Sequence, residues 1–219
     1  MSFIEKGERI VAVTVSDSLN PQDISERLSS IRELSGSHGS LGAVCVRNDS
    51  HSSQRFNDAV CQVASAWDGR IILQSSDMPN ISSSALNVMG RLVLILCSDP
   101  CALQVADIAS SALGMSLAVT GKDVEDLVNN VEGCGSEDIV IIPPADDIKG
   151  CLDQIEDLRR LHIDHGIGEA GRPVGLIVRS GEYAVSVASV AFHSGASLVV
   201  FDHIDPVGCA ILDTLIGSL

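Results

Sequence analysis

Polar residues that could bind a ligand recur in this sequence at one kind of position, directly after short apolar runs. The best candidates are an amide and three carboxylates: Asn48, Asp77, Asp99 and Asp202. Several such groups around one opening could hydrogen-bond a polar heterocycle such as a pterin. Each also has a plainer explanation, because Asn and Asp often cap the helix that follows. No residue stands out as a nucleophile or general base. We therefore predict a substrate-binding site and assign no catalytic residue.

Three other motifs suggest chemistry but fit it poorly. Residues 166–171 spell G-x-G-x-x-G, yet they follow a predicted helix and precede a predicted strand, the reverse of what a dinucleotide site requires. Cys97 and Cys101 have no second cysteine pair to complete a metal or cluster site, so we expect packing thiols and no metal. His203 lies in a DHIDPVG stretch whose register departs from the D-x-H-x-x-G loop of cobalamin-binding domains.

Composition excludes several classes of function. The 219 residues are 45% hydrophobic and 20% charged, which is typical of one globular domain covering residues 1–219. The net charge of −15 and the aromatic content of 3% argue against binding nucleic acid or an anionic membrane. The chain opens without a signal-like segment, and no apolar run reaches the roughly 18 residues of a membrane span. Seven scattered cysteines are typical of reduced thiols, so we expect a cytoplasmic protein.

Eight repeats of an apolar run, a polar turn and a helical pattern position the candidates. The clearest run is RLVLILCS at residues 91–98, which is apolar on both faces, as in a parallel sheet covered by helices. The predicted strands are residues 9–15, 42–47, 70–74, 91–98, 115–120, 138–142, 173–178 and 196–201. The predicted helices are residues 21–34, 54–66, 82–89, 101–113, 122–131, 147–162, 182–193 and 206–216.

Eight strand–helix units with short connections predict a small (β/α)₈ TIM barrel. The same alternation permits an open doubly wound parallel sheet. We favour the barrel because eight units close a barrel and no linker divides the chain. Barrels bind ligands where strands end, which is where the four candidates lie. A phosphate-binding barrel is a further alternative, in which Ser180 and Gly181 supply backbone N–H groups, although nearby carboxylates disfavour an anion.

Three segments carry a family resemblance: LGAVCVRNDSHSSQRFNDAVCQV, RLVLILCSDPCALQVADIAS and GSEDIVIIPPADDIKGCLDQIEDLRRLHI. Together they resemble the barrel domain of the corrinoid iron–sulfur protein large subunit, the gamma subunit of the archaeal acetyl-CoA decarbonylase/synthase complex. The resemblance covers residues 41–219 and implies a barrel related to pterin-dependent methyltransferases. That family also has a four-cysteine 4Fe–4S domain and a cobalamin domain. Neither matches this sequence, so we expect no metal or covalently bound cofactor.

The resemblance implies a stand-alone barrel in the one-carbon metabolism of the acetyl-CoA pathway or methanogenesis. It would bind a methyl-pterin or dock a corrinoid protein, with a tetrahydropterin or a partner's cobalamin as cofactor. The expected partner is a corrinoid protein or an acetyl-CoA-pathway subunit, and the oligomeric state stays open. As a methyltransferase-like enzyme, it would hold the pterin with Asn48, Asp77 and Asp99 while an acidic side chain protonates N5. The alternative is a non-catalytic interaction or assembly protein with no small-molecule substrate.

Overall fold

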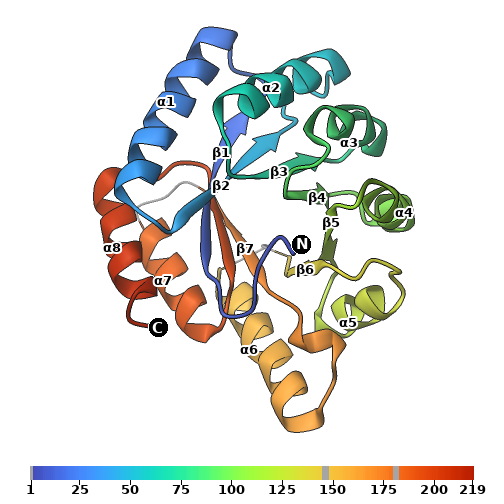
Figure 1. Cartoon of the computed structure of the whole chain (residues 1–219). Helices are drawn as coiled ribbons and strands as arrows, with labels where there is room; N and C mark the ends of the chain where they lie inside the picture. Colours follow the sequence, from blue (N-terminus) through green and yellow to red (C-terminus); the bar gives the residue numbers. More distant parts are fainter. Residues whose placement is uncertain (1, 145–147, 180–182) are drawn as a thin grey trace.

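Eight parallel strands form the centre of the molecule in a computed structural model that describes residues 2–144, 148–179 and 183–219. The strands are β1 (Ile10–Ser16), β2 (Leu41–Arg47), β3 (Arg70–Ser75), β4 (Val93–Cys97), β5 (Ser116–Thr120), β6 (Ile139–Ile142), β7 (Gly175–Val178) and β8 (Leu198–Phe201). They pair in the order β6-β5-β4-β3-β2-β1-β8-β7. A parallel bridge between Ile141 and Val174 joins the two outer strands of that order. The sheet therefore curls into a nearly closed TIM barrel (Figure 1), as predicted.

A helix follows each strand and covers the outside of the barrel (Figure 1). The helices are α1 (Pro21–Ser37), α2 (Ser53–Ala66), α3 (Met78–Ala85), α4 (Leu103–Leu113), α5 (Val124–Glu132), α6 (Ile148–His165), α7 (Ala184–Ser194) and α8 (Pro206–Ile216). Three short 3₁₀ turns accompany them: η1 (Leu86–Val88), η2 (Pro100–Ala102) and η3 (Glu169–Gly171). Within the described residues, no helix is both long and apolar enough to cross a membrane.

Several helix boundaries differ from the prediction; α1, for example, continues three residues beyond its predicted end at residue 34, to Ser37. The third helix was expected at residues 82–89, but α3 begins at Met78 with Pro79 in its first turn. Proline is tolerated there because the first N–H groups of a helix have no intrahelical partner. The sixth helix continues three residues beyond the predicted end, to His165. The predicted starts of the sixth and seventh helices, at residues 147 and 182, lie outside the described residues.

The strands divide the core into two layers, because successive side chains of a strand point to opposite faces. Residues such as Ala43, Cys45 and Ile72 pack inside the barrel. Residues such as Val44 and Leu73 pack between the sheet and the helices. This alternation also fixes which polar side chains at the strand ends turn toward the barrel interior.

The N-terminal segment packs with the inner layer of the core, which the sequence patterns did not predict. Phe3 is fully buried and clusters with the inward-facing strand residues. Its backbone N–H donates to Asp138 Oδ2 at 2.7 Å, and the Ser2 hydroxyl donates to Asp138 Oδ1 at 2.6 Å. Asp138 directly precedes β6, so this segment lies at the amino ends of the strands, opposite the candidate site.

A carboxylate on the last helix ties α8 to the connection between α1 and β2. Asp213 Oδ2 lies 2.7 Å from His38 Nδ1, and Oδ1 accepts hydrogen bonds from the Ser40 backbone N–H at 3.0 Å and from the Ser40 hydroxyl. Burial alone would raise the pKa of Asp213, but these hydrogen bonds outweigh it and hold the pKa below its usual value. The ionised carboxylate therefore stabilises the fold.

Candidate functional site at the carboxyl ends of the strands

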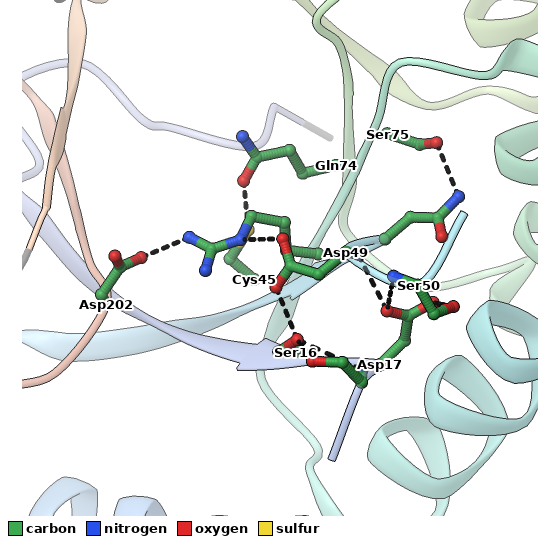
Figure 2. A network of polar contacts seen from close by, with 11 residues as sticks. Ser16, Asp17, Cys45, Asp49, Ser50, Gln74, Ser75 and Asp202 are labelled. Atoms are coloured by element: carbon green, nitrogen blue, oxygen red, sulfur yellow. Dashed lines mark hydrogen bonds and ion pairs between the residues drawn. The ribbon is translucent and has the colours of Figure 1, made fainter. Parts of the chain in front are cut away.

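Two of the four candidates, Asn48 and Asp77, meet at one hydroxyl. Asn48 directly follows β2, and Ser75 is the last residue of β3. The Asn48 side-chain Nδ2 donates to Ser75 Oγ at 2.9 Å (Figure 2). The backbone N–H of Asp77 donates to the same oxygen at 3.0 Å. The ends of two neighbouring strands thus bring together an amide, a hydroxyl and the residue that carries a carboxylate.

Asn48 is a buried polar residue whose hydrogen bonds are incomplete. The residue is 6% exposed, and its Oδ1 is buried without a hydrogen-bond partner among the described residues. Buried polar atoms of proteins nearly always have a partner, so such an atom calls for an explanation. Helix capping does not provide one, because Ser52 caps α2 by accepting from the Arg55 N–H. The Asn48 side-chain oxygen therefore has unused hydrogen-bonding capacity.

The three aspartates have different surroundings. Asp77 occupies the N-cap position of α3 but makes no capping hydrogen bond, and its side chain is exposed. Asp99 has the plainer role, since its Oδ1 accepts from the Cys101 N–H at 3.0 Å and caps η2. Asp202 accepts a hydrogen bond from Arg47 Nη1. Asn48 is thus connected to Asp77 by way of the Ser75 hydroxyl, whereas Asp99 and Asp202 have other partners.

A row of inward-facing residues at the same end of the barrel was missed at the level of sequence. Arg47 lies opposite Ser16 of β1 on one side and opposite Gln74 of β3 on the other. Arg47 is in phase with Cys45, and Gln74 with Ile72, both of which belong to the inner core. That two-residue phase could have identified Arg47 and Gln74 as lining the mouth of the barrel. We call Ser16, Arg47 and Gln74 the inner row.

Ion pairs hold Arg47 in place across the mouth. Its Nε donates to Asp49 Oδ1 at 2.8 Å, and its Nη1 pairs with Asp202 from the end of β8 (Figure 2). The Ser16 hydroxyl donates to the second Asp49 oxygen at 2.5 Å. Burial opposes the charge on Arg47, but the two carboxylates outweigh it and raise its pKa. Arg47 therefore stays charged, and its neighbours neutralise that charge.

The loop that carries Asn48 is fixed by a buried carboxylate. Asp17 is 1% exposed, and its Oδ1 accepts from the backbone N–H groups of Asp49 and Ser50, each at 2.8 Å. Its Oδ2 accepts from the Ser50 hydroxyl at 2.6 Å. A carboxylate that receives three hydrogen bonds holds its donors firmly. Asp17 thus positions the residues immediately after Asn48.

Arg27 of α1 fixes the loop after β8. It reaches the carbonyl oxygen of Asp202 and lies 2.7 Å from Nδ1 of His203. An arginine can only donate, so Nδ1 of His203 is the acceptor. Burial lowers the pKa of Arg27, and the nearby carboxylate of Asp202 only partly offsets this effect. The loop that carries Asp202 is therefore attached to the helix wall of the barrel.

Four cysteine thiols are poorly suited to nucleophilic chemistry: Cys45, Cys97, Cys134 and Cys209. Burial raises the pKa of Cys45 to about 12, and it also raises the pKa of Cys97. The pKa values of Cys134 and Cys209 are raised by burial to about 11. Thiols with raised pKa values stay protonated at neutral pH and are unreactive. The described residues contain no cluster of three or more His, Cys, Asp or Glu side chains that could hold a metal ion.

The remaining predicted features lie in other parts of the fold or outside the described residues. Residues 166–171 connect α6 to β7, at the amino ends of the strands, where a turn from helix to strand was expected. Ser180 and Gly181, the predicted phosphate-binding residues, lie outside the described residues. The structure therefore describes the candidate site mainly through β1, β2, β3 and β8.

Comparison with known proteins identifies the family. A family model described as "CO dehydrogenase/acetyl-CoA synthase delta subunit" matches residues 6–207. The chain belongs to this family. A curated relative, the corrinoid/iron-sulfur protein large subunit of Moorella thermoacetica, is 24% identical over 174 residues, which cover 76% of this chain. The match covers 39% of that relative, so the chain spans about two fifths of its length. The predicted resemblance to the corrinoid iron–sulfur protein is confirmed.

Solved structures confirm the barrel. The dihydropteroate synthase of Thermus thermophilus superposes with a TM-score of 0.70 at 13% identity, covering 97% of this chain and 94% of that one. The Yersinia pestis enzyme has a TM-score of 0.68 at 13% identity, covering 96% and 92%. The Coxiella burnetii enzyme, solved in complex with pteroic acid, has a TM-score of 0.68 at 12% identity, covering 97% and 94%. At these identities the likeness establishes the fold alone.

Proposed function

We propose that this chain acts in the one-carbon metabolism of the acetyl-CoA pathway or methanogenesis by binding a methyl-tetrahydropterin at the carboxyl ends of β2 and β3. The observation that carries the proposal is the buried Oδ1 of Asn48, which has no partner among the described residues. An unpaired buried acceptor costs about 1–3 kcal/mol, a cost that a ligand N–H group would remove. The amino and ring N–H groups of a pterin are donors of this kind.

The neighbours of Asn48 suit the same ligand. Ser75 Oγ accepts two hydrogen bonds, from Asn48 and from the Asp77 backbone, and its own proton remains available to a ligand acceptor. The exposed carboxylate of Asp77 makes no capping bond and can accept from a further N–H group. Together they offer acceptors and one donor at a single place, as recognition of a polar heterocycle requires.

Relatives support this ligand and this metabolic setting. The description of the family names CO dehydrogenase/acetyl-CoA synthase, and the name of the Moorella relative includes a corrinoid. Barrels of the same fold have been solved with pteroic acid and with a pterine-sulfa conjugate. A corrinoid protein or another acetyl-CoA-pathway subunit is accordingly the partner we propose, acting with this chain in the cytoplasm.

In the enzymatic form of the proposal, the N5–CH₃ bond of the pterin would break as the methyl group passes to the partner's cobalamin in its reduced Co(I) state, which would supply the electron pair of the new bond. N5 keeps the bonding electron pair and gains a proton. Asp77 is connected to Asn48 through Ser75 by its backbone N–H, and its carboxylate is exposed to solvent, so we assign Asp77 the relay of a solvent proton to N5. Asn48 and Ser75 orient the ring.

Binding and transfer can be measured separately. Calorimetric titration with a tetrahydropterin is expected to show one site per chain, and Asn48→Ala should weaken it at least tenfold. Asn129 of α5 supplies a matched control away from the site, since Asn129→Ala should leave binding unchanged. Transfer from methyl-tetrahydropterin to free cobalamin tests the enzymatic form. Absence of both binding and transfer would contradict the proposal.

A second candidate function, a non-catalytic interaction or assembly protein, is favoured by the outer helix faces. The chain has a net charge of −15, yet α3 contains no ionisable side chain and α4 and α8 contain one aspartate each. Large apolar side chains are exposed there, including Ile108 at 70% on α4 and Val207 at 67% on α8. Exposed apolar, uncharged faces are typical of protein interfaces.

The two functions predict different outcomes in a capture experiment. An assembly protein should retain a corrinoid protein or an acetyl-CoA-pathway subunit and show no affinity for tetrahydropterin. Ile108→Glu should abolish that retention if α4 forms the interface, whereas Asn48→Ala should not affect it. Retention that depends on Asn48 would instead favour the pterin site.

A further inference from the structure

We propose that Gln74 is a specificity-determining residue, which donates from its side-chain amide to a carbonyl oxygen of the bound heterocycle, and that the Cys45 thiol sets the direction of that amide. This inference rests on the proposed pterin-binding function and adds the group of the ligand that is recognised. It concerns the inner row, whereas the proposed function rests on Asn48.

Gln74 lies in the wall of the barrel, one residue before the end of β3. It faces Arg47 on β2 and Leu96 on β4, which belongs to the inner core. Its side chain is partly buried. Gln74 is therefore placed where a ligand entering the mouth would meet a polar group beside an apolar one.

The orientation of the Gln74 amide follows from its contact with a thiol. Cys45 Sγ lies 3.4 Å from Gln74 Oε1, at hydrogen-bonding distance for sulfur. Cys45 is fully buried, and burial raises its pKa to about 12, so the thiol keeps its proton at neutral pH and serves as the donor. The amide oxygen then faces Cys45, and the nitrogen is turned away from it (Figure 2).

Gln74 Nε2 is a neutral donor of the inner row with no acceptor among the described residues, whereas the charge of Arg47 is already paired with two carboxylates. Arg47 donates to Asp49 and Asp202, and the Ser16 hydroxyl donates to Asp49. No described residue accepts a hydrogen bond from Gln74 Nε2. The two N–H groups on that nitrogen can therefore meet a ligand acceptor. A ring carbonyl, such as the 4-oxo group of a pterin, is an acceptor of the required kind.

Two probes with different groups at position 4 test this inference. A pterin carries an oxygen at position 4 and a hydrogen on N3, whereas 2,4-diaminopteridine carries an amino group at position 4 and no hydrogen on N3. The acceptor at position 4 thus becomes a donor, and the substitutions at Gln74 isolate the effect of that position from the change at N3. The wild-type protein should bind the 4-oxo probe at least about tenfold more tightly than the 4-amino probe. The Gln74 amide N–H meets an acceptor in the 4-oxo probe and a second donor in the 4-amino probe. Fluorescence titration measures both affinities.

Substitutions at Gln74 should change the preference in a defined way. Gln74→Met removes the donor at similar side-chain length and should reduce the preference severalfold. Gln74→Glu replaces the donor with an acceptor and should reverse the preference. Gln104→Glu, on the exposed face of α4, adds the same charge elsewhere and should change nothing.

Substitutions at Cys45 test the positioning role. Cys45→Ser retains a donor and should retain the 4-oxo preference. Cys45→Ala frees the amide to rotate and should weaken the preference while the protein still binds both probes. Thermal melting of each variant establishes that it is folded, and Gln74→Met serves if Gln74→Glu does not fold.

The outcomes distinguish this inference from the proposed function. Binding of pterin with a 4-oxo preference that persists in both Gln74 variants would overturn the inference and leave the Asn48 site standing. Failure of the wild-type protein to bind either probe would overturn both. A severalfold lower preference in Gln74→Met together with an unchanged preference in Gln104→Glu would establish the role of Gln74.

Discussion

Replacing Asn48 with leucine separates a role in ligand binding from a role in folding. The two side chains have the same branching at Cγ, so Asn48→Leu removes the polar atoms with little change of shape. If Asn48 serves stability, its replacement should destabilise the protein. If Asn48 serves ligand binding, its replacement should leave the stability intact.

The contacts of Asn48 give the expected magnitude. The substitution removes the hydrogen bond from Asn48 Nδ2 to Ser75 Oγ, which is worth about 1 kcal/mol. It also removes a buried acceptor that has no partner among the described residues, which recovers about 1–3 kcal/mol. The net effect is a free energy of unfolding that is unchanged or higher by up to about 2 kcal/mol, which corresponds to a rise in Tm of up to about 4–8 °C.

Urea denaturation and calorimetric titration, on the same preparations, provide the assay. Asn48→Leu is expected to match or exceed the wild-type midpoint and to lose tetrahydropterin binding. Asn130→Leu is the control, because Asn130 Nδ2 donates to the Thr120 carbonyl at 2.9 Å and its replacement should cost about 1 kcal/mol. A loss of more than about 2 kcal/mol in Asn48→Leu, a size typical of breaking a buried structural network, would refute the reasoning.

Three further predictions concern the rest of the fold. Asp213→Ala should lower the free energy of unfolding by about 1–2 kcal/mol at neutral pH. The pKa of Asp213 is lower in the folded state than in the unfolded state, so its contribution to stability is present above the unfolded pKa and is lost as pH falls through the folded pKa. The stabilities of the mutant and the wild type should therefore converge in acid. Urea denaturation at a series of pH values measures this convergence. Asp138→Ala should release the N-terminal segment and lower the stability by about 2 kcal/mol, with faster proteolysis near the N-terminus as the readout. Iodoacetamide at neutral pH should label the exposed Cys61 and Cys101 and spare Cys45 until the protein is denatured, as followed by mass spectrometry.

The barrel was predictable because its signal is repeated eight times. Each strand is a short apolar run followed by polar residues, and each helix has its own 3.6-residue pattern. The parts that were not predicted are those that occur once. The burial of Phe3 depends on a distant carboxylate at Asp138, and the early start of α3 depends on Pro79 being accepted in a first turn. Neither dependence is visible as a local pattern.

The candidate site was predictable in position and less so in partners. Asn48, Asp77, Asp99 and Asp202 were predicted at strand ends, and the structure places all four there. The sequence could not tell that Asp99 caps η2 while Asp77, at the equivalent position before α3, makes no capping bond. Such differences depend on side-chain rotamers, which the residue type does not specify.

The inner row shows where a stricter use of strand periodicity would have helped. Arg47 and Gln74 each lie two residues beyond an apolar inward-facing residue, so the phase of β2 and β3 already directs them into the barrel. The predicted site residues follow the strands, whereas Arg47 and Gln74 are the last inward-facing residues within them. Their hydrogen-bond partners, however, come from different strands and require the folded structure.

The most direct test of the central claim is a calorimetric titration of the protein with a tetrahydropterin, carried out on the wild type and on Asn48→Leu. We predict one binding site per chain for the wild type and at least a tenfold loss of affinity for the variant, with both proteins folded. No binding by the folded wild-type protein, or equal binding by the two proteins, would contradict the claim that Asn48 is kept for a ligand.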